Sequence, residues 1–190
     1  MLADKPDDEL LDWLDGADEN ARPDRLARLK YLRSLYPAEQ DTLLFGGVVV
    51  PIALHEMRLT YVFGLDLACV LTAQVVLEHL LNGVLGWNGS DDHDDSGLRV
   101  LAKQAFDRSY ISEPEHKAID SLRRVRNPYT HPRPVMAEGC LIRRTAEAGV
   151  PMEEVIKRDA ELALVTVIGL ITRPPFAFPH EDAPDAAQGT

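Results

Sequence analysis

The chain has 190 residues, of which 45% are hydrophobic, and its formal net charge is −11. This length and composition are typical of one globular domain with a hydrophobic core, and they exclude a wholly disordered chain. The acidic balance argues against general binding of duplex DNA, because the mean field of the protein repels phosphate. The two cysteines, Cys69 and Cys140, are too few for a disulfide framework, so we expect reduced thiols in the core.

The first sixty residues are predicted to hold two helices and a buried connection. Residues 7–14 and 22–35 place leucines at helical spacing, and Pro23 suits a first helical turn. Gly46-Gly47, followed by three valines, is interpreted as a buried connection or a helix start, because a lone strand would have no partner. We assign residues 1–60 to a helical extension that packs on the main bundle.

The rest of the chain shows helical patterns separated by short polar segments. Ser112 and Glu115 form the capping-box pattern at the start of one of these helices. Helices are predicted over Pro51–Leu85 with a possible break at Gly64, over Leu98–Phe106, from Glu113 to about Arg126, and within Val150–Thr172.

This order predicts an all-α fold, a bundle of about four or five core helices over residues 61–175 with extra N-terminal helices. Residues 176–190 are predicted to form a disordered tail. The acidic segment 91–95 is interpreted as a solvated loop rather than a metal site, and the sequence suggests no metal or cofactor.

The chain is expected to be cytoplasmic, with no membrane span. Its N-terminus is acidic rather than basic, unlike a signal peptide. The apolar run Tyr61–Trp87 contains Asp66, Gln74, Glu78 and His79, which are costly in lipid, so we expect a buried protein helix there.

The segment Arg126-Asn127-Pro128-Tyr129-Thr130-His131 is the main candidate for chemistry. The residue before a proline avoids helical dihedral angles, and Asn is a favoured helix cap, so we expect Asn127 to end one helix and to cap a new turn at Pro128. Arg126 and His131 would then meet beside the positive end of that turn, which attracts phosphate.

Charge is concentrated around the same segment. Between Ser121 and Thr145 the chain has a single acid, Glu138, and six arginines, at positions 123, 124, 126, 133, 143 and 144. The planar guanidinium of arginine suits phosphate, so this basic island is the candidate site for a polyanion.

The hexapeptide resembles the R-N-x-x-x-H form of the R-x(4–6)-H motif of the HEPN superfamily. The helix Val70–Leu81 and the segment Ile111–Glu115 are similar to the family helices that precede the motif, and the likeness covers about residues 61–172. The resemblance implies a helical bundle that is usually a homodimer, with two motifs meeting at the interface. It also implies either a metal-independent endoribonuclease, often a toxin or defence effector with an antitoxin partner, or a non-catalytic nucleotide- or RNA-binding or dimerisation module.

The residue types suit RNA cleavage, because RNA carries its own nucleophile in the ribose 2′-hydroxyl. His131 would accept the hydroxyl proton, Arg126 would stabilise the charge on phosphorus oxygens, and Asn127 would cap the turn or orient the phosphate. The products would be a 2′,3′-cyclic phosphate and a 5′-hydroxyl. The residues assigned to substrate binding are Arg123, Arg124, Tyr129, Arg133 and Glu78.

Structural roles are open for several of these residues. Arg126 and His131 could form a plain helix cap, and Tyr129 could belong to the core or an interface. Gln74, Glu78 and Asn82 form a polar stripe on an apolar helix. Either Glu78 faces Arg126 and holds it in place, or the stripe faces water.

Overall fold

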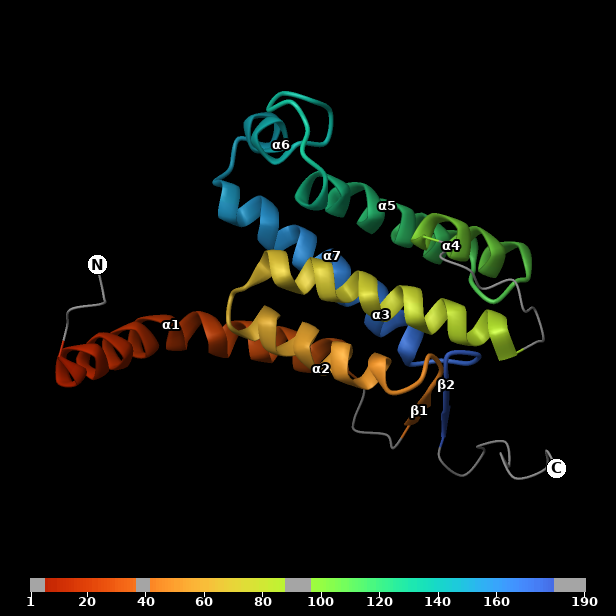
Figure 1. The fold of residues 1–190 in the computed structure, drawn as a ribbon, viewed down its shortest axis with the longest axis horizontal. Helices are drawn as coiled ribbons and strands as arrows, with labels where there is room; N and C mark the ends of the chain where they lie inside the picture. The colour runs from red at the N-terminus through yellow and green to blue at the C-terminus, as the bar shows by residue number, and fades with distance from the viewer. Residues whose placement is uncertain (1–5, 37–41, 88–96, 180–190) are drawn as a thin grey trace.

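A computed structural model describes residues 6–36, 42–87 and 97–179, which form a bundle of helices (Figure 1). The all-α prediction is confirmed, and five helices, α2, α3, α4, α5 and α7, supply most of the core. The elements in chain order are α1 (Asp7–Leu35), β1 (Thr42–Leu44), α2 (Val49–Val62), α3 (Asp66–Trp87), α4 (Leu98–Asp107), α5 (Glu113–Thr130), α6 (Leu141–Ala148), α7 (Met152–Ile171) and β2 (Ala177–Pro179).

Helix α3 is the centre of the bundle. It packs against α2, α4, α5 and α7, and its residues Leu77, Leu80 and Leu81 are fully buried. Among the described residues it is the one helix long and apolar enough to cross a membrane by length and composition. Its surroundings are those of a core helix, as the sequence predicts for this apolar run.

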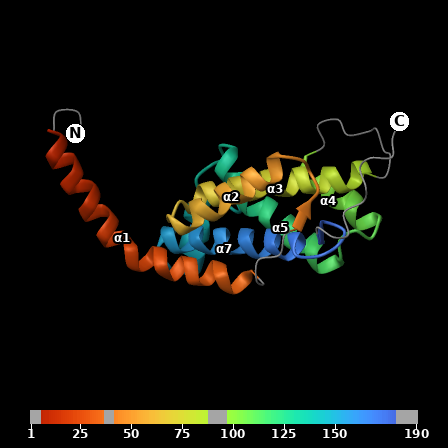
Figure 2. The ribbon, with the colours of Figure 1, turned by 90° about the horizontal axis from the view of Figure 1, so that it is seen from below.

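Helix α1 is attached to the body through its second half. Arg28, only 7% exposed, donates to both carboxylate oxygens of Asp66 at 2.5 and 3.0 Å and to Asp24 at 2.7 Å. Burial alone would lower the pKa of this guanidinium, but its hydrogen bonds to Asp66 and Asp24 outweigh burial and raise the pKa. The first half of α1 projects beyond the bundle in both views (Figures 1 and 2).

The prediction of two separate helices in this region is wrong, because α1 continues through Gly16 and Pro23 without a break. The segment between positions 15 and 20 was predicted to lie outside a helix because it has no apolar residues at helical spacing. A helix that projects into solvent is exposed on every side, so polar residues do not interrupt it.

Two close backbone turns shape the region between α1 and α3. Gly64 has a φ of +73° and separates α2 from α3, as the sequence predicts. Gly46, with a φ of +95°, lies directly on Gly83 of α3, where an added Cβ would come within 2.4 Å of the Gly46 nitrogen. Side chains at these two contacting positions would therefore push the chain before α2 away from the core.

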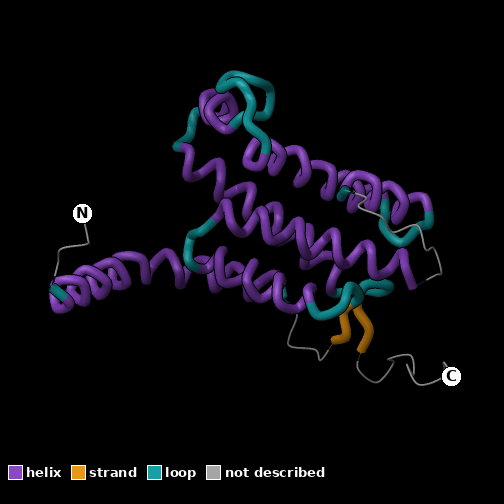
Figure 3. The backbone as a smooth tube through the Cα atoms, viewed as in Figure 1, coloured by secondary structure: helices purple, strands orange, loops and turns teal. Residues whose placement is uncertain are grey.

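The C-terminal segment departs from the predicted disordered tail. Phe176 is fully buried, and Ala177–Pro179 forms strand β2, which pairs antiparallel with β1 (orange in Figure 3). The sequence interpretation missed the strand because its partner lies more than 130 positions earlier. The rest of the predicted tail, residues 180–190, and the acidic segment 91–95 lie outside the described residues.

The division at residue 60 is also not a structural boundary. Helix α2 spans positions 49–62, and its residues Met57 and Tyr61 are buried in the same core as α3. The N-terminal extension proper is therefore α1. Both cysteines are buried and unpaired with each other, as predicted, and burial raises the pKa of the Cys69 thiol to about 12.

Candidate active site

Helix α5 carries the motif and begins as the sequence predicts. The backbone N–H of Ser112 donates to the Glu115 carboxylate at 2.6 Å, which closes the capping box. The helix then continues to Thr130, and His131 follows it with extended dihedral angles (φ −124°, ψ 119°).

The predicted helix break at Asn127 is therefore wrong. Pro128 lies in the last turn of α5, where a missing N–H leaves only the carbonyl of Arg124 without its helical partner. The His131 N–H still donates to the Asn127 carbonyl at 3.0 Å and closes the turn. The helix accommodates the loss of this one hydrogen bond and ends two residues later, at Thr130.

This continuity changes the electrostatics of the motif. The residues lie at the carbonyl end of a helix, so the free N–H groups expected beside Arg126 and His131 are not there. Arg126 is half-buried on the helix, whereas His131 is exposed just beyond its end. Any anion bound here must be held by side chains.

Arg126 is held by a chain of polar contacts across three helices. Its Nε donates to Oε1 of Gln74 on α3, and its Nη1 donates to the Thr130 hydroxyl at 3.1 Å. The Gln74 amide in turn donates to Glu78 at 2.6 Å, and Glu78 accepts the N–H of Leu98 at the start of α4 at 3.2 Å. These contacts fix the guanidinium while leaving its Nη2 without a partner among the described residues and not sealed from solvent.

The polar stripe on α3 is thus partly as predicted. Gln74 is only 9% exposed, so the stripe does not simply face water. Glu78 supports Arg126, but through Gln74 rather than by direct contact. Gln74 and Thr130 belong to the site and were not among the predicted site residues, although Gln74 was part of the stripe.

The charge of Arg126 is poorly compensated. Burial lowers the pKa of its guanidinium, nearby Glu78 raises it, Arg123 lowers it, and the net pKa is below the usual value. No carboxylate of the described residues lies within ion-pair distance of it. A half-buried cation bonded only to neutral oxygens favours the arrival of an anion.

Most arginines of the basic island already contact a carboxylate. Arg123 and Arg124 share Asp120, each at 2.7 Å, and Arg143 pairs with Glu147 at 2.7 Å. Arg133 is exposed and has no ion pair within the described ranges. Of the predicted substrate-binding arginines, Arg133 alone has no carboxylate partner in the part of the chain that the structure describes.

Tyr129 has a structural role. Its hydroxyl donates to Asp159 of α7 at 2.6 Å, and Arg144 binds both oxygens of the same carboxylate at 2.5 and 2.7 Å. Asp159 is only 3% exposed, so this cluster ties α5, α6 and α7 together. Burial and the hydrogen bond to Asp159 both raise the pKa of Tyr129.

Asn127 is turned toward its own helix. In one orientation of its amide, Oδ1 accepts from Arg126 Nη1 at 3.5 Å. With the amide oxygen and nitrogen exchanged, the nitrogen donates to the Arg123 carbonyl at 3.1 Å and the oxygen accepts from Arg123 Nη1 at 3.3 Å. In both orientations Asn127 contacts residues of its own helix instead of capping a new turn. The described residues contain no group of three or more His, Cys, Asp or Glu side chains placed to hold a metal ion.

Together these features define an all-helical bundle in which a positioned arginine, with no contacting carboxylate among the described residues, lies in the last turns of α5, and an exposed histidine follows just past the end of that helix. Comparisons with known proteins find no matching family model, no similar curated protein and no similar solved structure. Membership of the HEPN superfamily therefore stays a prediction from the motif.

Proposed function

We propose that the protein is a metal-independent endoribonuclease of the HEPN type, with Arg126 and His131 as its catalytic residues. The observation that carries this proposal is the state of Arg126. Its guanidinium is positioned by Gln74 and Thr130, and it lacks a contacting carboxylate among the described residues. Such a group is prepared to bind a phosphate.

The proposed reaction is an intramolecular transesterification of RNA. His131 accepts the proton of the ribose 2′-hydroxyl as the 2′-oxygen forms a bond to phosphorus. Arg126 stabilises the negative charge that grows on the non-bridging oxygens, and the bond from phosphorus to the 5′-oxygen breaks. The 5′-oxygen takes up a proton from water and His131 returns its proton to solvent, which leaves a 2′,3′-cyclic phosphate and a 5′-hydroxyl.

The test is cleavage of a labelled RNA oligonucleotide by the purified full chain in EDTA. We expect Arg126→Ala and His131→Ala each to lower the cleavage rate by about 100-fold or more. Arg124→Ala is the matched control, because its side chain is 73% exposed and already paired with Asp120. Circular dichroism and thermal unfolding check that all variants fold.

Cleavage that needs a divalent cation, or that survives both substitutions, would contradict the proposal. The ends of the products provide a second check, since a cyclic phosphate blocks 3′ extension until it is opened and removed enzymatically.

A second candidate is a non-catalytic RNA- or nucleotide-binding module. The observation that favours it is the unbroken α5, which leaves Arg126 on the helix and His131 beyond its end instead of bringing both to one new helical turn. This candidate predicts RNA binding that falls in Arg126→Ala but not in His131→Ala, with no cleavage by any form of the protein.

A further inference from the structure

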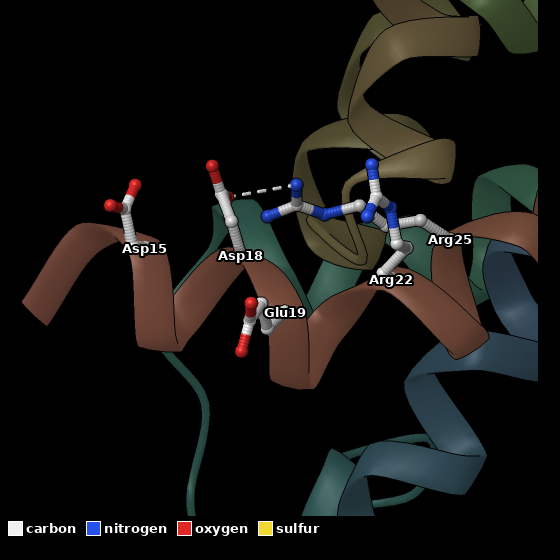
Figure 4. Close-up of a pocket in the computed structure, with 5 residues that line it drawn as sticks. All are labelled: Asp15, Asp18, Glu19, Arg22 and Arg25. Atoms are coloured by element: carbon white, nitrogen blue, oxygen red, sulfur yellow. Dashed lines mark ion pairs between the residues drawn. The ribbon is translucent and has the colours of Figure 1, made fainter. Parts of the chain in front are cut away.

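Helix α1 is divided into two halves of opposite charge. Positions 7–19 contain seven carboxylates and no basic residue, whereas positions 22–33 contain five basic residues and one acid. Figure 4 shows the junction, with Asp15, Asp18 and Glu19 on one side and Arg22 and Arg25 on the other. One ion pair, from Arg25 to Asp18 at 3.0 Å, joins the halves within the chain.

An exposed apolar stripe runs along both halves. Leu11 is 60% exposed, and Leu14, Leu26 and Leu29 are each 51% exposed. Charged residues continue the stripe at spacings of three or four, which keeps all of its members on one face of the helix. The stripe consists of Asp7, Leu11, Leu14, Asp18, Arg22, Leu26, Leu29 and Arg33, all exposed.

The order of residues along the stripe is symmetric about position 20, except that an aspartate in the first half corresponds to an arginine in the second half. Reversal about position 20 places each leucine on a leucine and each aspartate on an arginine. The pairs are Asp7 with Arg33, Leu11 with Leu29, Leu14 with Leu26, and Asp18 with Arg22. A twofold axis through this point would form every pair twice, as an antiparallel coiled coil of two identical helices requires.

We propose that α1 pairs antiparallel with α1 of a second copy of this chain, about a twofold axis near position 20. Parallel pairing would face seven carboxylates with seven others, so charge favours the antiparallel direction. The stripe is also separate from the face that holds α1 to its own body, where Arg28 and Leu32 are buried.

The arrangement of the molecule leaves space for such a partner. The first half of α1 extends past the bundle in both views (Figures 1 and 2), and in the second half Leu26 and Leu29 are each 51% exposed, so the body covers the stripe in neither half. The interface involves neither Arg126 nor His131, so it stands independently of the proposed nuclease activity. It also differs from the dimer implied by the HEPN resemblance, in which the two motifs meet.

The experiment measures the mass of the full-length protein in solution by light scattering and sedimentation at micromolar concentration. We expect a dimer, with a dissociation constant raised by at least about tenfold in Leu14→Glu and in Leu26→Glu. Val100→Glu on α4, where the side chain is 46% exposed, is the matched control and should leave the dimer unchanged.

Charge exchange tests the register. Asp18→Arg alone and Arg22→Asp alone should each weaken the dimer, because like charges then face each other across the axis. The double variant Asp18→Arg with Arg22→Asp should restore the dimer, and an equimolar mixture of the two single variants should form a heterodimer.

A wild-type monomer would overturn the proposal. It would also be overturned by a dimer that neither the leucine nor the charge substitutions weaken, since another surface would then be responsible. RNA cleavage plays no part in these readouts, so their failure is distinguishable from failure of the proposed function.

Discussion

Two arginines reach α3 from neighbouring helices, and they end in opposite electrostatic states. Arg28 of α1 meets the carboxylate of Asp66, and its pKa rises. Arg126 of α5 meets the neutral amide of Gln74, and its pKa falls. The first arginine is a closed ion pair that attaches a helix, whereas the second keeps an open charge, which is the state that binding of an external anion requires.

The largest expected effect on stability comes from breaking the ion pair between Arg28 and Asp66. Arg28→Met would leave the Asp66 carboxylate, only 11% exposed, without its partner, so we expect the free energy of unfolding to fall by about 3 kcal/mol. Arg126→Met removes a cation that lacks a contacting carboxylate and should cost about 1 kcal/mol or less. Urea unfolding followed by circular dichroism measures both.

Equal losses in these two variants would show that Arg126 is as structural as Arg28 and would remove the contrast. Arg124→Met, at a mostly exposed pair, is the baseline and should change stability by no more than about 0.5 kcal/mol.

The second prediction concerns a variant in which Arg126 gains a contacting carboxylate, as Arg28 already has. In the double variant Gln74→Glu with Glu78→Gln, the carboxylate moves one helical turn along α3 and contacts Arg126 directly. The Gln74 amide and the Leu98 N–H both donate to the same oxygen of Glu78, so the new glutamine at position 78 must rotate to donate from its nitrogen to position 74 and to accept from Leu98 at its oxygen. RNA cleavage should fall by at least about tenfold while stability changes by about 1 kcal/mol or less.

Glu78→Gln alone is the control for this exchange, because it keeps a neutral amide against Arg126. Cleavage kinetics and RNA binding by fluorescence anisotropy are the measurements. Unchanged values in the double variant would mean that the charge of Arg126 does not act on the substrate.

The sequence predicted the helices whose signals are local and periodic. The capping box at Ser112 and Glu115 and the turn at Gly64 are set by neighbouring residues, and both have the expected form. Two local signals were misleading. The polar stretch in α1 reflects a helix exposed on all sides, and α5 continues through Pro128 to Thr130 in spite of the hydrogen bond that the proline removes.

The candidate site was less predictable because its electrostatics depend on tertiary contacts. The sequence places Asp120 within three or four positions of Arg123 and Arg124, so their pairing could have been anticipated. Asp159, which neutralises Arg144 and binds Tyr129, is fifteen or more positions away from both. Which residue of the stripe touches Arg126 depends on how α3 and α5 are rotated against each other, and no local pattern encodes that.

The smallest expected effect on stability concerns Arg173, which pairs with a carboxylate as Arg28 does but is more exposed to solvent. Arg173 donates to Glu115 at 2.5 Å at the partly exposed start of α5. Burial raises the pKa of Glu115, but hydrogen bonds from Arg173 and Ser112 outweigh burial and hold the pKa below its usual value of 4.5. The folded state therefore binds the Glu115 proton less tightly than the unfolded state, so this carboxylate adds stability above pH 4.5 that is lost as the pH falls through the folded pKa.

Arg173→Met should bring the folded pKa of Glu115 closer to 4.5 and reduce this acid-dependent loss, by about 1 kcal/mol or less, because both side chains are partly exposed. Urea unfolding at a series of pH values from about 6 to about 3 measures the slope. Ser112→Ala, which removes only the hydroxyl contact and keeps the backbone donor, should retain more of the slope than Arg173→Met. The reverse order would mean that the capping box, rather than the arginine, sets the charge state of Glu115.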